Sequence, residues 1–597
     1  MFCIRQIIRK LSYYPQIMEK SKNLAVFSQN IDNNMFSFSF YLDCPDPKIS
    51  RQFNMARSND ETMEGFLHRL RENLKKVVLK KNKKVKKKPG DVSNANEDPI
   101  LPICFVKSSS EIQVRDSDKA KDFLSQDGLQ VKILSELFDI VVDPPMVLAV
   151  KLPDTILAGF FLYPFKIELN FAEQKDCVFS WYVSEPDFEP NEANDLLKAE
   201  SYKTAKWNFR QKGFFFNVSN EDVHKYVKLE ILPKNGEKEG LKYESYSKAK
   251  VSAGPGKCPF EDRHAFTSNR TDKNSIRVLT YNLLADLYAD SDFSRTQLHP
   301  QCPPYALDIA YRKSLFMKEM IGYNADIMCL EEVDRKIFQH DLNPVFEVRG
   351  YEGDFCVKGG QVSEGLACFW NTEKFRKLSS KRTVFTDAVV TDENFKNILE
   401  VLDTNEQLKA RFLRRTTAMQ TVVLDSKVGD SGLVVGVTHL YYKPDADHIR
   451  LLQIAMVIKE LEMAKKRAEE EWPDKVFSVL LCGDFNSTPP FGVLDFIRNK
   501  VINEDHADWK SAENEHVKNL KIQHEFQMDS ACGTPQYTTY TIGFKDCLDY
   551  IFYETDKFEV SQVVPFPTEE EMSVHKGLPN VVFPSDHIAC IADLKWK

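Results

Sequence analysis

Hydrophobic and polar positions change their pattern along this chain, and the changes divide it into parts. Between residues 145 and 255, short runs of alternating apolar and polar residues are separated by Gly, Pro, Asn and Asp: VLAVKL, FKIELNF, VFSWYVSE, GFFFNVS and YVKLEILP. A period of two is typical of half-buried β-strands. We therefore predict an immunoglobulin-like β-sandwich, with Trp181 as a core anchor but without the cysteine pair of antibody domains.

Residues 35–135 have a mixed pattern. The segment SFSFYLD (37–43) has strand composition, a helical pattern follows over Thr62–Leu79, and PICFVK and residues 129–142 supply further strands. This order predicts a small α+β domain of ubiquitin-like type. The run Lys75–Lys88 contains nine lysines; such a run is typical of a solvated linker, although it would also suit contacts with RNA phosphates.

After the Gly/Pro linker AGPGKCPF (253–260), strands alternate with helices to the C-terminus. This alternation predicts an α/β enzyme domain over residues 270–597. We find no internal repeat, and in particular no leucine-rich repeat, in the sequence.

Composition narrows the possible classes. The chain has 597 residues, of which 42% are apolar and 28% charged, so it can form a packed core and wholesale disorder is excluded. Its net charge of -8 excludes a globally basic nucleic-acid coat protein. The 13 cysteines form no C-x-x-C pair, which argues against a zinc ribbon or a secreted disulfide framework. No uncharged apolar run reaches about 18 residues, so we expect no membrane partner.

The first 22 residues have the profile of a mitochondrial targeting segment. Arg5, Arg9 and Lys10 are basic, no acid precedes Glu19, and several apolar residues can share one helical face. A frayed terminus that happens to lack acids is the alternative. The sequence thus predicts location in the mitochondrial matrix, or a cytosolic form if translation starts at Met18.

Polar residues that an apolar core would not select stand at the ends of the strands in the last block. They are Asn282, Glu331 and Glu332, Thr438 and His439, Asp484 and Asn486, Asp549, and Asp586 and His587. A single Glu or His at such a place is more often a surface or core residue, but the sequence GDFNSTP together with LDY and PSDH is a specific signal. Because α/β sheets place ligands at strand ends, we expect one convergent site. Oxygen ligands without cysteine favour Mg²⁺ or Mn²⁺, and imidazolium groups suit phosphate.

These motifs resemble the endonuclease/exonuclease/phosphatase superfamily, in particular its deadenylase branch. The similarity covers about residues 270–597 and is carried, in order, by TYNLLAD, CLEEVD, EGLA, THLY, CGDFNSTP, LDYIF and PSDHIA. The resemblance implies a four-layer α/β sandwich, two packed β-sheets flanked by helices. It also implies 3′-to-5′ hydrolysis of adenylate chains to 5′-AMP, on 2′,5′-oligoadenylate and on 3′,5′-poly(A) tails. Two departures are Glu331, where the family has Gln, and Lys443, where His is common.

The resemblance assigns roles residue by residue. Metal ligands are expected among Glu332, Asn282, Asp484, Asn486 and Asp586. The expected catalytic residues are Asp484, which deprotonates water, with Asn486, His439, and His587 paired with Asp549. Substrate contacts are expected from Phe544 and Pro444, which would stack on adenine, and from Asn282 and His439.

Two other classes remain open from the sequence alone. One is a phosphatase acting on a nucleotide cofactor or phosphoinositide, and the other is a non-catalytic RNA-binding scaffold on the same fold. RNA is the expected partner, and no obligatory protein partner is predicted. The sequence does not determine the choice between 2′,5′ and 3′,5′ linkages, the oligomeric state or the role of the N-terminal domains.

Overall fold

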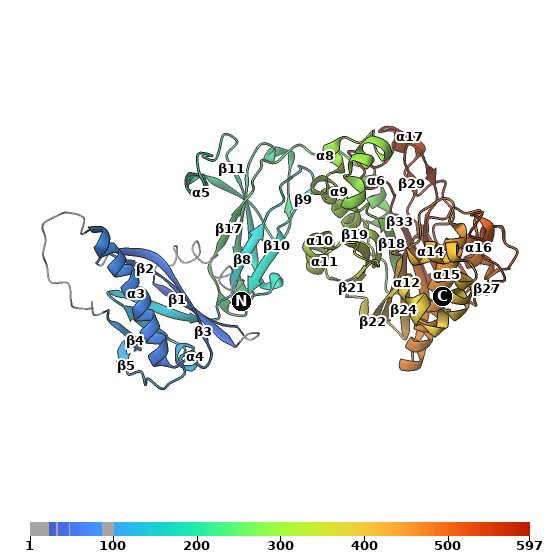
Figure 1. Ribbon diagram of the computed structural model, residues 1–597. Coiled ribbons are helices and arrows are strands. Elements are labelled where there is room, and N and C mark those ends of the chain that lie inside the picture. Colours follow the sequence, from blue (N-terminus) through green and yellow to red (C-terminus); the bar gives the residue numbers. More distant parts are fainter. Residues whose placement is uncertain (1–22, 31–33, 47, 86–100) are drawn as a thin grey trace. The chain divides into compact units, whose positions relative to one another are not determined.

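The computed structural model describes residues 23–30, 34–46, 48–85 and 101–597 (Figure 1). The predicted targeting segment 1–22 lies outside the described residues. Contacts divide the chain into two compact units. The first contains Met1–Leu152, Lys166–Phe214 and Tyr226–Ser247, and the second contains Pro153–Phe165, Phe215–Lys225 and Lys248–Lys597. The predicted division of the chain into domains stays a prediction.

The first unit opens with a seven-stranded sheet of order β3-β2-β1-β7-β6-β4-β5. Its elements are β1 Leu24–Asn30, β2 Met35–Cys44, β3 Ile49–Ser58, α3 Met63–Val85, β4 Ile103–Lys107, β5 Ser110–Ile112, α4 Ala120–Leu124, β6 Leu129–Ile133 and β7 Glu136–Val142. In β2 the alternation buries Phe36, Phe38 and Phe40, and Phe36 and Phe38 pack against Phe66 of α3. The sheet thus extends beyond residues 35–135 at both ends.

The lysine-rich run 75–88 is predicted to be a linker, but its first part is helical. Helix α3 continues to Val85, past the predicted end at Leu79, so residues 75–85 are helical. Residues 86–88 lie outside the described part of the chain. Lysine is a good helix former, and the run contains no Gly or Pro before Pro89, so nothing local ends the helix earlier.

Residues 145–255 contain the predicted strands and one unpredicted helix. The elements are β8 Met146–Lys151, β9 Phe161–Leu162, β10 Phe165–Asn170, β11 Val178–Ser184, α5 Asp195–Thr204, β12 Trp207–Lys212, β13 Phe216–Asn217, β14 Val227–Leu232, β15 Lys234–Asn235, β16 Lys238–Glu239 and β17 Tyr243–Tyr246. Strands β12-β11-β14-β17 form a four-stranded sheet. Trp181 is fully buried on β11 and donates its indole N–H to the Gly213 carbonyl, as a core anchor requires. Helix α5 begins at Asn194, whose side chain caps the Leu197 N–H.

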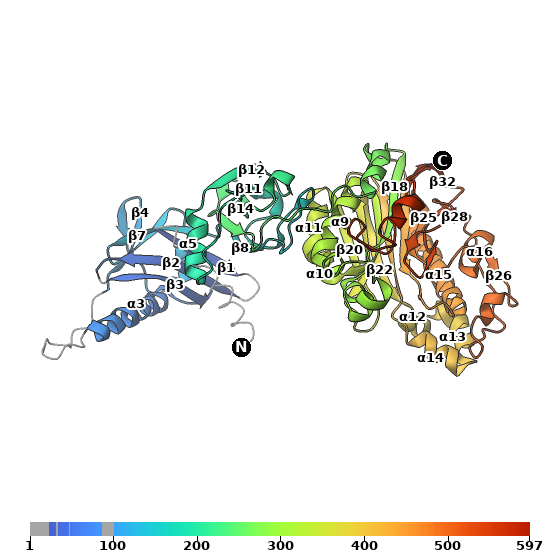
Figure 2. The ribbon, with the colours of Figure 1, turned by 90° about the horizontal axis from the view of Figure 1, so that it is seen from above.

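Two six-stranded sheets lie face to face in the second unit, with helices outside them (Figures 1 and 2). The first sheet has the order β20-β21-β19-β18-β33-β32, with β18 Ser275–Asn282, β19 Ile327–Asp334, β20 Tyr351–Val357, β21 Glu364–Asn371, β32 Phe558–Val563 and β33 Cys590–Trp596. The second has the order β22-β23-β24-β25-β31-β28, with β22 Phe375–Val384, β23 Ala418–Ser426, β24 Ser431–His439, β25 Val476–Asp484, β28 Met528–Ser530 and β31 Asp549–Glu554. The predicted mixed α/β fold with two packed sheets is confirmed.

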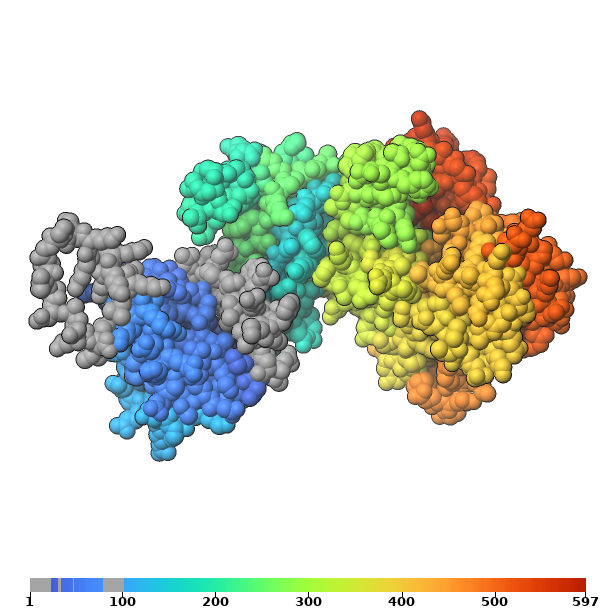
Figure 3. Space-filling view, in the orientation of Figure 1, coloured from blue at the N-terminus to red at the C-terminus, as the bar shows by residue number. Residues whose placement is uncertain are grey.

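Helices complete the outer layers of this unit. The larger ones are α9 Ile309–Gly322, α12 Phe385–Thr391, α13 Lys396–Asp403, α14 Glu406–Leu413, α15 Asp447–Glu471 and α16 Gly492–Asn499. Figure 3 shows the segment around α12–α15, in yellow and light orange, on the surface of the unit. The central strands β18, β24 and β25 are buried over nearly their whole length, because one face packs on the other sheet and the opposite face on helices.

Within the described residues, no helix combines the length and the apolar composition that a membrane crossing requires. The cysteines of the described chain carry free thiols.

Candidate active site

Three neighbouring strands of the second sheet bring His439, Asp484 and Asp549 side by side. In the strand register, His439 of β24 pairs with Asp484 of the parallel strand β25, and Asp484 pairs with Asp549 of the antiparallel strand β31. Because directly paired residues point to the same face of a sheet, their side chains form one row. All three are at least nine-tenths buried.

The turn that follows β25 depends on backbone conformations that few residues adopt. Gly483 has φ +152°, and a Cβ at this position would lie 1.9 Å from the Thr438 carbonyl oxygen of the neighbouring strand. Asn486 has φ +49°, donates its backbone N–H to Asp484 Oδ1 (2.9 Å) and donates its amide to the Leu440 carbonyl (3.1 Å). The turn thus fixes the Asp484 carboxylate relative to the end of β24.

The first sheet supplies Asn282 and Glu332. The pairing of β19 with β21 is irregular between Leu330 and Val333, and Glu332 has φ +53°. Simple alternation would direct Glu331 and Glu332 to opposite faces, whereas such a bulge re-aims a side chain. Glu332 Oε2 accepts the Ala285 N–H (3.0 Å).

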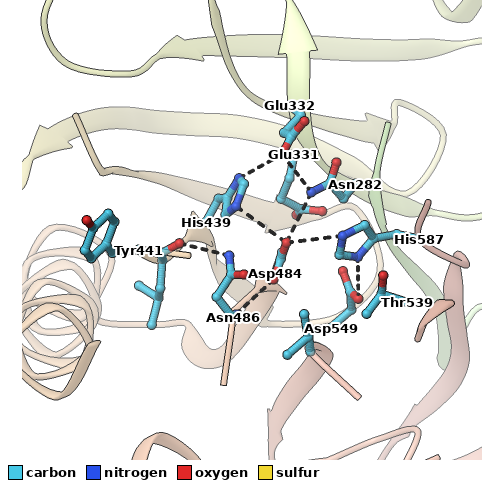
Figure 4. Close-up of polar contacts among 12 residues, drawn as sticks. Asn282, Glu331, Glu332, His439, Tyr441, Asp484, Asn486, Thr539, Asp549 and His587 are labelled. Atoms are coloured by element: carbon cyan, nitrogen blue, oxygen red, sulfur yellow. Dashed lines mark hydrogen bonds and ion pairs between the residues drawn. The ribbon is translucent and has the colours of Figure 1, made fainter. Parts of the chain in front are cut away.

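The Asn282 amide joins the two sheets. Its Nδ2 lies 3.3 Å from Glu332 Oε1 and 3.2 Å from Asp484 Oδ2, while its Oδ1 accepts the Leu284 N–H (3.0 Å). Figure 4 shows Asn282 between these two carboxylates, with His439 and His587 on either side of Asp484. Side chains that are 202 residues apart in the sequence therefore meet in one cluster, as the strand-end pattern predicted.

His587 is held as a charged group. Its Nδ1–H donates to Asp549 Oδ2 (2.8 Å), which also accepts the Thr538 hydroxyl (2.5 Å), and its Nε2 lies 3.7 Å from Asp484 Oδ2. Burial alone would lower the pKa of His587, but the carboxylates of Asp549, Asp484 and Asp586 outweigh it and raise this pKa well above its usual value. His587 is therefore an imidazolium at neutral pH.

His439 is held neutral, in contrast to the expectation that both histidines are charged. Burial, together with the charges of Lys358 and His587, lowers the pKa of His439 well below its usual value. Its Nδ1 lies 3.2 Å from Lys358 Nζ, and an ammonium group can only donate, so Nδ1 accepts. The proton therefore resides on Nε2, which faces Asp484 Oδ2 at 3.5 Å.

Lys358 was missed by the sequence analysis. It is buried, forms an ion pair with the fully buried Glu364 (2.8 Å), and follows directly after strand β20. Its position in the sequence could have indicated it. Lys358 directly follows a strand and precedes two glycines, as the other polar residues of the site follow strands.

The carboxylates in this cluster have the electrostatics of a cation site. Burial raises the pKa of Glu332 to about 7, with Glu364 and Asp586 adding to it and Lys358 opposing it. Burial also raises the pKa of Asp484 to about 6, with His587 opposing it. A divalent cation would offset the free-energy cost of keeping these buried carboxylates ionised.

Unpartnered atoms support the same interpretation. Among the described residues, Asp549 Oδ1 and Glu331 Oε2 are buried without a hydrogen-bond partner. Asp484, Asp549 and His587 each offer a ligand atom within 4.8 Å of one another, but Asp549 and His587 already bond to each other. The oxygens of Glu332 and Asp484 form a hard donor set that would fit a divalent ion, whereas Asn282 directs its amide nitrogen toward them and its Oδ1 accepts the Leu284 N–H.

The remaining predicted residues lie around this cluster. Glu331 is fully buried, accepts the Thr280 hydroxyl (3.1 Å), and has a pKa raised well above its usual value by burial and by Asp549 and Asp484. Asp586 lies beside the cluster, with its carboxylate 3.4 Å from the Ser585 hydroxyl.

Phe544 and Pro444 lie on exposed loops at different ends of the row. Phe544 is 47% exposed in the turn between β29 (Thr539–Tyr540) and β30 (Lys545–Asp546), and Thr539 pairs with His587. Pro444 is exposed in the segment that follows His439. Their stacking on adenine stays a prediction.

Comparison with known proteins agrees with this geometry. The family model described as "Endonuclease/Exonuclease/phosphatase family" matches residues 279–587. The chain belongs to this family. A second model, "2′,5′-phosphodiesterase 12-like, N-terminal domain", matches residues 144–252.

Curated relatives extend over most of the chain. The 2′,5′-phosphodiesterase 12 of Rattus norvegicus is 36% identical over 575 residues, covering 92% of this chain and 93% of that protein. The Homo sapiens 2′,5′-phosphodiesterase 12 is 36% identical over 573 residues with the same coverage. The CCR4-Not complex 3′-5′-exoribonuclease subunit Ccr4 of Mycosarcoma maydis is 28% identical over 364 residues, covering 56% of this chain and 52% of that protein. The family membership inferred from the sequence motifs is confirmed.

Proposed function

We propose that this chain is a metal-dependent phosphodiesterase that releases 5′-AMP from the 3′ end of adenylate chains, both 2′,5′-linked and 3′,5′-linked. The observation that carries the proposal is the convergence of Asn282 and Glu332 from one sheet with His439 and Asp484 from the other, and with His587 from the segment before β33. The relatives named 2′,5′-phosphodiesterase 12 and 3′-5′-exoribonuclease support both the reaction and the substrate class.

The chain's own residues divide the chemistry among them. Asp484 orients the attacking water and takes its proton. The charged His587 and the neutral Nε2–H of His439 each donate to oxygens of the phosphate, where negative charge grows in the transition state. Attack in line with the leaving ribose oxygen requires no covalent intermediate.

Glu332 and Asp484 would hold the cation, and Asn282 would orient both carboxylates through its amide. When bound, a divalent ion supplies Lewis-acid polarisation of the phosphate and stabilises the leaving oxygen. We propose Mg²⁺, with Mn²⁺ as an alternative, because the donors are carboxylate oxygens.

Location in the mitochondrial matrix is part of the proposal. It is supported by Arg5, Arg9 and Lys10 and by the absence of acids before Glu19. Translation from Met18 would yield a cytosolic form. Imaging of fluorescent fusions that begin at Met1 and at Met18 tests this point, and a cytosolic signal from the Met1 fusion would contradict it.

The decisive experiment compares substrates and linkages directly. Purified protein is incubated with 2′,5′- and 3′,5′-linked oligomers of adenylate and cytidylate, with MgCl₂ or with EDTA, and products are separated by size. We expect Mg²⁺-dependent release of 5′-AMP one residue at a time. Inorganic phosphate from a monoester would instead indicate a phosphatase, and binding of oligomers without turnover would indicate a scaffold.

A matched pair of variants provides the control. Glu332→Gln should abolish hydrolysis because a cation ligand is lost. Glu331→Gln should retain it, because burial and the nearby Asp549 and Asp484 raise the pKa of Glu331 and favour its neutral form, which an amide resembles in shape. Equal loss in both variants would contradict the assignment of Glu332 as the ligand.

The predicted base contact has its own test. Phe544→Ala should raise KM for oligoadenylate more than KM for a small phosphodiester, since stacking is typically worth about 1–3 kcal/mol per base. An equal change for both substrates would remove the stacking role.

A further inference from the structure

Two exposed tyrosines stand on the His439 side of the site, outside the residues discussed so far. Tyr442 follows His439 by three residues, and its side chain is 63% exposed. Tyr288 is 38% exposed and lies in α7 (Asp286–Ala289), which begins directly after Ala285, whose N–H binds Glu332. Both segments therefore leave from residues that build the site.

Tyr288 is tied to the catalytic cluster by a chain of buried contacts. Its hydroxyl donates to Glu364 Oε1 (3.1 Å), Glu364 pairs with Lys358 (2.8 Å), and Lys358 donates to His439 Nδ1 (3.2 Å). This chain fixes the ring beside the site while leaving more than a third of it exposed. Tyr288 and Tyr442 are thus both connected to His439, the first through this chain of contacts and the second through the short segment that follows His439.

Tyr442 has an exposed ring on an anchored backbone. The preceding Tyr441 is buried, meets the Tyr442 ring edge-on with centroids 5.5 Å apart, and is covered by Arg415, whose guanidinium lies 4.4 Å from its centroid. Lys443 Nζ lies 5.1 Å from the Tyr442 centroid. An exposed aromatic ring with an ammonium group over it suits a ligand that alternates flat bases with phosphates.

We propose that Tyr288 and Tyr442 form a second nucleobase subsite on the His439 side of the scissile phosphate, separate from the base that Phe544 and Pro444 are predicted to contact. The proposal rests on the proposed function, since it gives the neighbouring base of the same adenylate chain a place to stack. Continuity with the phosphate site and the charge of Lys443 favour a nucleotide over a protein segment as the occupant.

The test is a double-mutant cycle between protein and substrate. The release of the first 5′-AMP is measured for a tetraadenylate and for the same chain made abasic at one position at a time. Tyr442→Ala should lower kcat/KM on the intact chain by about 10-fold, the order expected for loss of one stacked base. On the chain that is abasic at the matching position, the same variant should change nothing.

Tyr305→Ala is the matched control. Tyr305 is similarly exposed, at 59%, and its ring contacts Tyr311 with centroids 5.4 Å apart. This variant should hydrolyse all chains as the wild type does. An equal loss for Tyr442→Ala on every chain, or no loss on any, would overturn the subsite.

Equilibrium binding separates this proposal from the proposed function. Fluorescence anisotropy of a labelled tetraadenylate in EDTA reports binding without cleavage. Weaker binding by Tyr442→Ala than by Tyr305→Ala supports the subsite even if no 5′-AMP is ever released, and equal binding by both contradicts it. Absence of 5′-AMP from the wild type in MgCl₂ contradicts the proposed function alone.

Discussion

The carboxylate of Glu332 should make the metal-free protein less stable as pH rises, and a bound cation should counteract this loss. Burial raises the pKa of Glu332 to about 7, whereas the unfolded chain ionises this group near its usual value of 4.5. Between these two pH values the folded protein keeps a proton that the unfolded chain has lost. The free energy of unfolding of the metal-free protein therefore falls as pH rises through this window, and levels off above it.

The size of the effect follows from the shift. One pKa unit corresponds to roughly 1.4 kcal/mol. Glu332 alone therefore lowers the free energy of unfolding of the metal-free protein by about 3 kcal/mol at pH 8 and by about 1 kcal/mol at pH 5.5. Asp484, with its pKa raised to about 6, acts in the same direction. A divalent cation binds the ionised carboxylates, so its stabilising effect should be larger at pH 8 than at pH 5.5.

Urea unfolding at both pH values, in EDTA or in MgCl₂, measures this directly. Other titrating groups also contribute, and comparison with Glu332→Gln isolates the one of interest. In EDTA, the free energy of unfolding of Glu332→Gln relative to the wild type should increase by about 2 kcal/mol as pH rises from 5.5 to 8. Addition of MgCl₂ should change the free energy of unfolding of this variant little. A stability difference between the two proteins that is the same at both pH values would refute the reasoning, as would stronger protection by MgCl₂ at the lower pH.

Substitutions at three further positions test the geometry. Asp549→Asn should lower kcat by about 10²- to 10⁴-fold with little change in folding, because His587 loses the carboxylate that keeps it charged; an unchanged kcat in steady-state assays would contradict the pairing. Lys358→Met should give His439 a mixture of the two neutral tautomers, whereas Lys358→Arg should keep one, and ¹⁵N NMR of the chelated protein distinguishes these results. Gly483→Ala should lower the free energy of unfolding by more than roughly 2 kcal/mol, because the added Cβ would collide with a backbone carbonyl. Wild-type stability of this variant in calorimetry would contradict the requirement for glycine at this position.

The strand-end residues could be predicted from the sequence because each directly follows an apolar run. Asn282, His439 and Asp484 are the last residues of β18, β24 and β25, so a polar side chain after a buried strand marks the edge where strands end together. The family motifs added the order of these segments. The parallel register of His439 with Asp484 then places the two groups as neighbours.

Local departures from regular structure could not be predicted in this way. The bulge at Glu332 requires a positive φ, and no residue at the bulge is of a type that favours one. Period-two alternation alone would have placed the side chains of Glu331 and Glu332 on opposite faces of the sheet. Helix α5 interrupts an otherwise alternating pattern, and α3 extends into a lysine run because helix propensity outweighs charge repulsion there. The partner of His439 also escaped prediction, because contacts between distant strands decide which lysine reaches it.

The two histidines show how partners rather than residue type set the chemistry of this site. Asp549 makes His587 a cation, while burial, aided by Lys358, makes His439 a neutral donor, so only one of the two offsets negative charge. Carboxylates around the scissile position consequently outnumber the cations. A phosphodiester anion approaching this cluster would be repelled unless a divalent ion were present, since the cost of bringing like charges together is greatest where water is excluded. The metal requirement we expect is thus imposed by the charge balance of the protein itself, and substrate binding and cation binding should favour each other.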